Sequence, residues 1–224
     1  MEVDPLASDS SLAVSTEKVP PLTPAGQRRA AARQSILTGA RELITENGFA
    51  AAQMSLIAVR AGVGVGSIYQ HFPSRAELFA EVYRSVAAHE FDVVESAVAA
   101  ATGGHVDRIT IAVQTFCTRA LLAERFAYAL LVEPAEAAVE EHRLAFREGY
   151  RILFARLIAD GIEEGGLPAQ DVDISAAAVL GIMTETLVRP LRDQHEMNTP
   201  EDLVRQVVAL CLAAVTAVST TTEG

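Results

Sequence analysis

Tryptophan is absent from the 224-residue sequence, cysteine occurs twice, and lysine occurs once, as Lys18. Cys117 and Cys211 lie far apart and form no C-x-x-C pair, which predicts two small core residues rather than a disulfide framework or a zinc site. The nine prolines lie almost entirely at segment edges, which suits separate helices better than a β-sandwich. Alanine, leucine and arginine are abundant instead, and they lose little free energy on entering a helix. The composition therefore predicts an all-α protein.

Motifs for catalysis, metal binding and nucleotide cofactors are missing as well. The histidines form no H-E-x-x-H motif and no ligand pair at helical spacing. They are His71, His89, His105, His142 and His195. The glycine run from Gly62 to Gly66 lacks the third glycine of a dinucleotide fingerprint, and no Gly-Lys-Ser or Gly-Lys-Thr follows it. Glutamate pairs such as Glu140-Glu141 are typical of a solvated helix surface. We therefore expect no catalytic residue, no metal and no cofactor.

Long apolar runs and targeting signals are not apparent in the sequence. Residues 1–19 are polar and acidic and lack the apolar centre of a signal peptide. The longest apolar run, Val207 to Val218, is shorter than the roughly 20 residues that span a bilayer. We expect a soluble cytoplasmic protein without a membrane partner.

The formal net charge of −11 is distributed unevenly along the chain. From Pro24 to Arg75, six arginines oppose two glutamates, which gives this segment a charge of +4. Residues 1–23 carry −3 and residues 76–224 carry −12. A basic segment on an acidic body is the electrostatic footprint of a DNA-reading domain, because phosphate contacts dominate affinity for DNA.

Helical periodicity covers the chain after a polar beginning. Residues 1–23 are rich in serine, proline and acids, which predicts a disordered tail. The expected helices cover residues 25–47, 53–61, about 65–72, 74–101, 105–116 or beyond, 119–132, 134–164, 171–192 and 199–219. We predict a tail over residues 1–23, a DNA-binding domain over 24–75 and a larger helical domain over 76–224.

The stretch from Gln53 to Phe72 has the pattern of two short helices joined by a tight turn. Apolar residues at three-four spacing indicate one buried face on the first helix, and Gly62 stops it, since glycine adopts the left-handed conformation that closes a helix. A second helix begins near Val65, with Ile68 on its inner side. Two such helices form a helix-turn-helix, whose second helix fits the DNA major groove.

At these residues the chain resembles the amino-terminal domain of the TetR family of bacterial transcriptional regulators. The resemblance runs from about Ala25 to Phe79. Its motifs are Asn47-Gly48-Phe49, Ile57-Ala58, Ala61-Gly62-Val63, Gly66-Ser67-Ile68-Tyr69, Phe72-Pro73-Ser74-Arg75 and Glu77-Leu78. The chain departs from the family pattern at Gln53, at Gly64 and at Val65, where the family often has serine or threonine, serine and lysine. The missing lysine removes a phosphate contact, which leaves more of the binding to backbone amides and arginines.

The predicted DNA contacts lie on the second motif helix, at the start of the first motif helix and near the two ends of the predicted DNA-binding domain. Gln70 is suited to a bidentate pair with adenine, and free amides near Gly66 are suited to a phosphate. Tyr69 is assigned a backbone contact by the resemblance, and Arg75 stands where the family usually has a lysine. The full predicted set is Arg28, Arg29, Gln53, Gly64, Val65, Gly66, Ser67, Tyr69, Gln70, His71 and Arg75.

An aromatic stripe in the larger domain predicts a small-molecule cavity. His142, Phe146, Tyr150 and Phe154 recur every fourth residue, as on one face of a helix. An apolar cleft with a few polar groups is the usual form of such a site, although an aromatic stripe is also common in a plain core. The predicted ligand-binding residues are Phe116, Phe126, Tyr128, His142, Phe146, Tyr150, Met183 and Leu187. Glu133, Thr184 and Glu185 are possible polar anchors.

The last two expected helices are apolar nearly all round. Residues 175–183 and 207–218 would leave large apolar patches in water if only one side were buried. Small residues on both segments permit close helix approach. Packing against the same pair from a second copy solves the exposure, and the resemblance also implies a dimer of this kind.

Together these features predict an all-helical transcriptional regulator that binds a palindromic DNA operator as a homodimer. A small, largely apolar effector is expected to release it, so repression relieved by ligand is the default. One alternative is a helical protein-interaction module with a degenerate helix-turn-helix, supported by the departures at Gly64 and Val65. An enzyme would need a catalytic pair in the larger domain, and no motif for one is found.

Overall fold

The computed structural model describes residues 23–193 and 199–217, which form eight α-helices and no strand. The helices are α1 (Pro24–Ala51), α2 (Met54–Ala61), α3 (Val65–His71), α4 (Arg75–Ala99), α5 (His105–Leu131), α6 (Ala137–Glu163), α7 (Val172–Arg192) and α8 (Pro200–Thr216). The all-α prediction is confirmed. The predicted tail, apart from Thr23, lies outside the described residues, as does the predicted end of the last helix.

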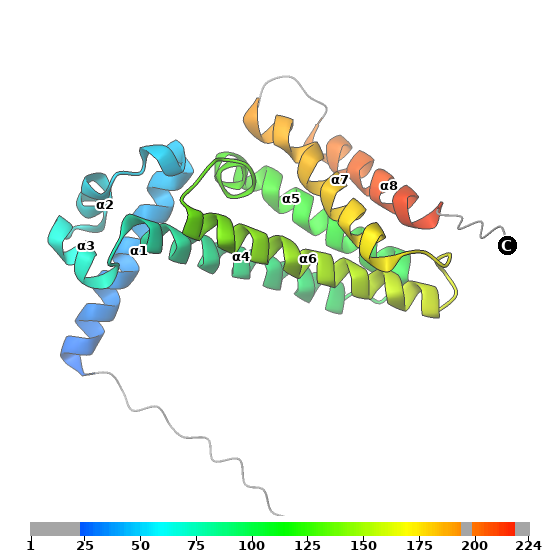
Figure 1. Cartoon of the computed structure of the whole chain (residues 1–224), viewed down its shortest axis with the longest axis horizontal. Coiled ribbons are helices and arrows are strands. Elements are labelled where there is room, and N and C mark those ends of the chain that lie inside the picture. Colours follow the sequence, from blue (N-terminus) through cyan, green and yellow to red (C-terminus); the bar gives the residue numbers. More distant parts are fainter. Residues whose placement is uncertain (1–22, 194–198, 218–224) are drawn as a thin grey trace, which may run out of the picture.

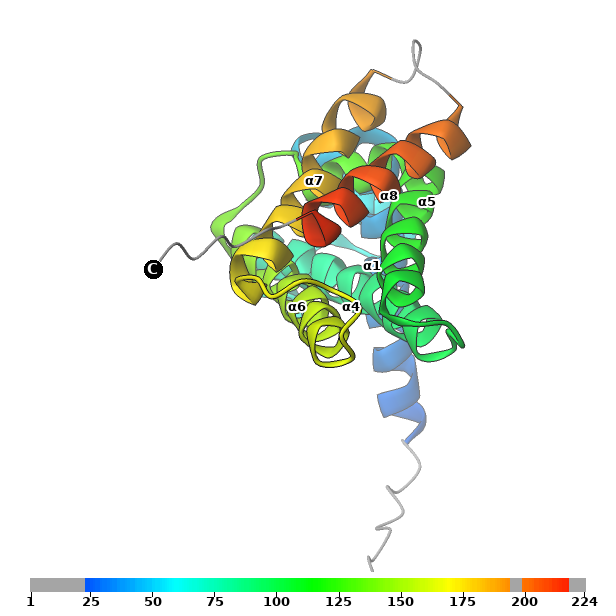
Figure 2. The same ribbon diagram turned by 90° about the vertical axis from the view of Figure 1, so that its right-hand side faces the viewer.

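Helices α1, α2 and α3 form a small head at one end of an elongated molecule (Figure 1). The long helices α4 to α8 extend away from it as a bundle, which we call the body. Helix α4 belongs to both parts, because it starts beside the head and runs along α5 and α6. In the view turned by 90°, α7 and α8 lie side by side on the outer side of the body, next to α5 (Figure 2).

Side-chain caps begin several of these helices. The Thr23 and Ser74 hydroxyls accept hydrogen bonds from the backbone N–H groups of Gly26 and Glu77, at 3.2 and 3.1 Å. The Asp171 carboxylate accepts one from Ile174 at 3.0 Å in the same way. Each cap satisfies a backbone donor that has no partner inside its own helix.

Two predicted boundaries are wrong. The segments 105–116 and 119–132 form the single helix α5, because no glycine or proline separates them; the helix kinks at Glu124 instead, where φ is 41° and ψ is −110°. Pro134 does not open α6, which begins at Ala137 with Glu136 as its N-cap. Residues between Val132 and Glu136 thus form a turn between α5 and α6.

Two hydrophobic cores follow from this arrangement. The head core gathers Ile36, Phe49, Ile57, Ile68 and Phe79 around α1 to α4, all essentially inaccessible to solvent. It also takes two residues from α5 beyond the kink and one from α6, namely Phe126, Ala129 and Val139. The body core is formed by α4 to α8. The predicted division at residue 75 stays a prediction, because α4 supplies side chains to both cores.

By length and composition, α7 is apolar enough to cross a membrane. It packs against α5, α6 and α8, and its side chains Val179, Met183 and Leu187 are fully buried in the body core. One side of α7 is thus packed inside the helical bundle, whereas Ile174 on its other side is exposed.

Candidate nucleic-acid interface and adjoining cleft

The turn between α2 and α3 has the geometry of a helix-turn-helix. Gly62 closes α2 in the left-handed conformation, with φ 68° and ψ 31°. Its N–H and that of Val63 donate to the carbonyls of Val59 and Ala58 at 3.2 and 3.0 Å. An extended Gly64 then starts α3, and Ile68 anchors α3 in the head core without solvent exposure. Helix α3 is therefore held on the outside of the head by the turn and by its own inner face, and its outer face is left uncovered.

The outer face of α3 is accessible. Tyr69 is 49% exposed, Gln70 is exposed, and Ser67 and His71 are half-buried. A Cβ placed on Gly64 or Gly66 would meet no atom within 4 Å, so the start of α3 faces open space. Gln53, the N-cap of α2, is exposed without making a side-chain cap, and Val65 is 41% exposed. The structure thus brings the predicted contacts of the motif to one end of the head.

Four of the six arginines of the head show the difference between paired and available side chains. Arg33 pairs with Glu81 at 3.2 Å and lies over the Phe72 ring, and Arg60 pairs with Glu46 at 2.7 Å. These guanidinium groups are held on the protein itself. Arg28 and Arg29 are exposed on the first turns of α1, and no carboxylate of the described residues lies within ion-pair distance of either. The local charge of +4 therefore overstates the number of arginines that are available to phosphate.

Arg75 occupies an unexpected position. Its guanidinium lies over the Phe79 ring, donates to the Phe49 carbonyl at 2.5 Å and pairs with Glu136 at 2.8 Å. Glu136 lies in the turn between α5 and α6. Arg75 therefore joins the head to the body, and its predicted phosphate contact, which stays a prediction, would compete with these bonds.

Glu133 makes a second connection between the same turn and the head. Its carboxylate accepts a hydrogen bond from the Ala50 N–H at 3.3 Å. Gly48 has a φ of 77°, and a Cβ there would lie 2.4 Å from a Glu133 carboxylate oxygen. The glycine of the Asn47-Gly48-Phe49 motif thus permits both the local backbone turn and the approach of Glu133.

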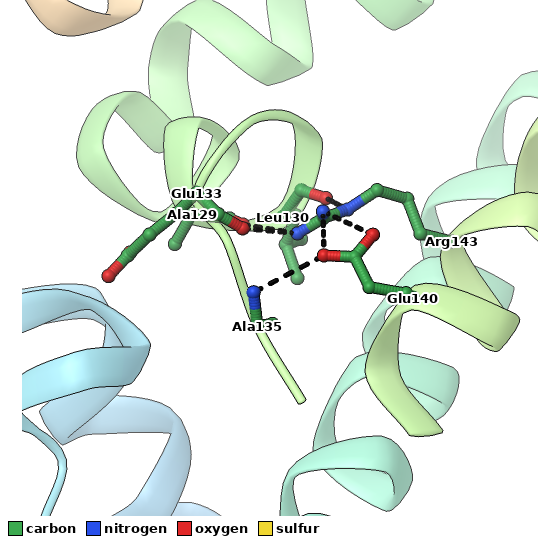
Figure 3. Close-up of polar contacts among 6 residues, drawn as sticks. All are labelled: Ala129, Leu130, Glu133, Ala135, Glu140 and Arg143. Carbon is green, nitrogen blue, oxygen red and sulfur yellow. Dashed lines mark hydrogen bonds and ion pairs between the residues drawn. The ribbon is translucent and has the colours of Figure 1, made fainter. Parts of the chain in front are cut away.

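Arg143 of α6 holds this turn in place from the other side. Its guanidinium donates to the carbonyls of Leu130 and Glu133 at 2.8 and 2.7 Å, and to that of Ala129 at 3.2 Å. Glu140 pairs with Arg143 and also accepts from the Ala135 N–H at 3.2 Å. Figure 3 shows the Glu133 side chain leaving this cluster toward the blue ribbons of the head. Only 11% of the Arg143 side chain is exposed, so these bonds are shielded from water.

A cleft of about 780 Å³ lies between α1, α4 and α5. Its apolar wall includes Leu37, Val86, Phe116, Phe126 and Phe146. Its rim carries Thr38 and Arg41 from α1, Glu90 from α4 and Arg119 from α5. Arg119 and Glu90 form an ion pair across α4 and α5, with one hydrogen bond of 2.8 Å. The cleft therefore lies where the head meets the body.

Two tyrosines are buried close to this cleft. Tyr83 lines it, and burial raises the pKa of its hydroxyl to about 12, so it stays protonated. The Tyr150 ring packs edge-on against Phe116, Phe146 and Phe91, with centroids 4.9–5.1 Å apart. Burial also raises the pKa of Tyr150, and its hydroxyl has no hydrogen-bond partner among the described residues.

The predicted ligand-binding residues separate into three groups. Phe116, Phe126 and Phe146 line the cleft. Tyr150, Met183 and Leu187 belong to the fully buried body core. Tyr128 and His142 are half-buried and lie outside the lining. Sequence reasoning missed the walls from α1 and α4, because a helix face with mixed polarity has the pattern of a solvated surface.

Other sites for chemistry are not evident. Within residues 23–193 and 199–217, no cluster of His, Cys, Asp and Glu side chains is arranged to hold a metal ion. Burial raises the pKa of both cysteine thiols to about 12, so neither is poised to react as a thiolate. Of the possible polar anchors, Glu133 bonds to the head, and the Thr184 hydroxyl donates to the Leu180 carbonyl at 2.9 Å.

Comparison with known proteins agrees with this geometry. Residues 36–82 match the family model described as bacterial regulatory proteins of the TetR family. The chain is 31% identical over 134 residues to the HTH-type transcriptional repressor KstR of Rhodococcus jostii, a match that covers 57% of this chain. The chain spans 60% of the length of that relative.

Solved structures share the fold over most of the chain. A TetR/AcrR family regulator from Thermobifida fusca is 25% identical, with a TM-score of 0.64 over 80% of this chain and 96% of its own. The regulator FadR from Bacillus subtilis, solved in complex with stearoyl-CoA, is 18% identical, with a TM-score of 0.70 over 83% of this chain and 99% of its own. Residues 36–82 thus match the TetR family of bacterial regulatory proteins, and the fold is shared with a TetR/AcrR family regulator over 80% of this chain.

Proposed function

We propose that this protein is a dimeric, DNA-binding transcriptional regulator that a small apolar effector releases from a palindromic operator. The observation that carries the proposal is the accessible outer face of α3, with Tyr69 and Gln70 exposed and open space at Gly64 and Gly66. A helix held only by its inner face, with free amides at its start, fits the major groove and can bind phosphate there. The matching relative KstR is described as a repressor, which supports repression as the default.

Contacts to DNA are proposed to divide by type. Gln70 reads a base edge, a pairing worth about 1–3 kcal/mol of discrimination. Tyr69, Ser67 and His71 contact the backbone or a thymine methyl group. Arg28 and Arg29 approach phosphates beside the groove from the start of α1. Gln53 and the amides near Val65 complete the interface.

The second copy is proposed to pack on α7 and α8. On α7 the exposed positions include Ile174, which is 68% exposed, and the small residues Ala177 and Ala178. On α8 they include Leu210, which is 53% exposed, and Ala213. Both stripes follow three-four spacing on the outer side of the body, and small residues let two helices approach closely. A four-helix interface buries both stripes and places two copies of α3 about 34–36 Å apart, in successive major grooves.

A ligand acts in this scheme through its different affinity for two conformations of the dimer. The ligand-bound conformation holds the two heads at a spacing that does not fit the operator. The predicted effector is largely apolar, in keeping with the aromatic wall formed by Phe116, Phe126 and Phe146. The protein is proposed to be soluble and cytoplasmic, without catalytic activity.

Fluorescence anisotropy tests the proposal on DNA from the region upstream of the gene, with scrambled DNA as the reference. The expected result is tight binding to a palindrome that weakens steeply with salt, because phosphate contacts release counterions. The double variant Tyr69→Ala with Gln70→Ala is expected to lose about 2–4 kcal/mol of binding free energy, roughly 30- to 800-fold in Kd. Gln114→Ala, an exposed glutamine on α5, is the matched control and should bind as the wild type does.

Binding that is absent or insensitive to salt, repeated on a selection of genomic fragments, would instead favour the alternative of a protein-interaction module. That alternative rests on Gly64 and Val65, where the family pattern has serine and lysine. Turnover of any compound that binds the body would indicate an enzyme.

A further inference from the structure

We infer that the cleft between α1, α4 and α5 binds an elongated apolar molecule with a single anionic group, and that Arg41 holds this group. The inference deepens the proposed function and rests on it for its regulatory consequence, because it assigns the effector a site at the junction of head and body. Of the aromatic stripe on α6 that predicted a cavity, only Phe146 lines this cleft.

The shape of the cleft supports a ligand rather than an incidental gap. Each of its three main walls is one face of a helix, with residues at three-four spacing over several turns. On α1 these are Gln34, Leu37, Thr38, Arg41 and Thr45. The volume of about 780 Å³ lies within the range of about 300–1,000 Å³ that small-molecule sites occupy.

Charge at the rim indicates the chemistry of the ligand. Glu42 and Glu46 share Arg60 as their partner, and Glu90 is bound to Arg119, so each of these carboxylates already has a guanidinium within ion-pair distance. Arg41 is exposed at the rim, and no carboxylate of the described residues lies within ion-pair distance of its guanidinium. Arg41 is therefore the arginine of the described lining that has no carboxylate partner, and its guanidinium is available to one carboxylate or a similar monoanion.

The apolar lining behind the rim indicates the chemistry of the rest of the ligand. Behind the rim, Val82, Val86, Phe116 and Phe126 form an apolar surface, and Phe146 lies at its α6 side. Arg119 and Glu90, paired with each other, bring no net charge to the lining. An alkyl or other slender apolar chain suits this lining, since burying it removes apolar surface from water without leaving a polar group unpaired.

Position links this site to the DNA-binding surface. Helix α1 forms one wall and α5 another, and these two helices also pack directly against each other. Helix α5 is kinked at Glu124, a non-glycine residue with a φ of 41°, and beyond the kink Phe126 and Ala129 pack in the head core, whereas Ala127 packs in the body core. Such a backbone conformation is strained for a residue that has a side chain. A ligand between α1 and α5 therefore acts on the junction that sets the direction of the head.

Isothermal titration calorimetry of the full-length protein without DNA tests the inference. The probes are decanoate and decan-1-ol, which share a chain and differ in charge. The wild type is expected to bind decanoate more tightly than decan-1-ol. Arg41→Gln is expected to weaken decanoate binding about tenfold and to leave decan-1-ol binding unchanged. Arg156→Gln, an exposed arginine on α6 that pairs with Glu95, is the matched control and should change neither.

Filling the cleft provides a second, independent arm. Ala120→Phe adds a ring to the α5 wall and is expected to weaken both probes at least tenfold, whereas Ala88→Phe, at an exposed position of α4 outside the lining, should have no effect. Equal decanoate affinity in wild type and Arg41→Gln overturns the assigned anion contact, and unchanged binding to Ala120→Phe, or no decanoate binding by the wild type, overturns the site. Because the titration contains no DNA, these outcomes can be interpreted even if the protein does not bind an operator. For a protein that binds its operator, decanoate should raise the Kd for DNA in the wild type and not in Ala120→Phe.

Discussion

The head and the outer side of the body both expose residues that a single chain does not use, but their chemistry differs. Around α3 and the start of α1, the exposed positions include polar residues and glycine, as with Gln70, Arg28 and Gly66. On the outer stripes of α7 and α8 they include apolar and small residues, as with Ile174 and Ala213. A polar surface with positive charge suits a hydrated phosphate backbone, whereas an apolar stripe suits a second protein surface that excludes water. Each partner can therefore be inferred from the kind of surface left exposed.

The largest expected effect comes from reversing the chemistry of the apolar surface. Leu210→Arg places a charge in the proposed α7–α8 interface of both copies, and an unpaired buried charge costs about 3–5 kcal/mol. We expect a monomer at micromolar concentration in analytical ultracentrifugation, with operator binding weakened in parallel. Leu144→Arg, at a 68% exposed position on α6, is the control and should remain dimeric. A dimeric Leu210→Arg protein would place the interface elsewhere.

A smaller effect is expected where head and body meet. Gly48→Ala forces a side chain onto a backbone with a φ of 77° and toward the Glu133 carboxylate. We expect a loss of about 1–3 kcal/mol in the free energy of unfolding, measured by urea denaturation. Gly165→Ala, also at positive φ but with open space around its Cβ, separates the two causes, since it carries only the backbone strain. Equal losses in both variants would mean that the approach of Glu133 contributes nothing.

Two arginines of the head allow a test of which side chains on this surface contact phosphate. Arg28 has no ion-pair partner among the described residues, whereas Arg60 is bound by Glu42 and Glu46. We expect Arg28→Gln to reduce the salt dependence of operator binding by about one unit of slope, because one phosphate contact is lost. Arg60→Gln should leave that slope unchanged. The reverse result in salt-dependent anisotropy titrations would contradict the division of the arginines.

The smallest effect concerns pH. The hydrogen bond from Arg60 lowers the pKa of Glu46 below its ordinary value of 4.5. A carboxyl group whose pKa is lower in the folded state stabilises the protein above the unfolded pKa, and this contribution disappears as the pH falls through the folded value. The difference in urea midpoint between wild type and Arg60→Gln should therefore be present at pH 7 and shrink below about pH 4.5. A difference that grows on acidification would contradict this assignment.

Local chemistry allowed much of the head to be predicted. The glycine stop at Gly62 and the cap at Ser74 depend on residues within three or four positions of each other, so the sequence contains the whole interaction. The predicted break between residues 116 and 119 is wrong. The apolar spacing is irregular there, but no glycine or proline ends the helix. The start at Pro134 was wrong for a related reason. A proline permits a helix start, but here Pro134 lies inside the turn, where Arg143 donates to the Glu133 carbonyl and Glu140 accepts from the Ala135 N–H.

The sequence by itself determined the helical class, the helix-turn-helix and the apolar faces of α7 and α8, because each depends on residue type and on short-range periodicity. Only the tertiary structure decided that Arg75 and Glu133 join head to body, that α5 bends at Glu124, and that α1, α4 and α5 enclose a cleft. These features depend on contacts between residues tens of positions apart. Their geometry follows from how the helices pack, which no local pattern records.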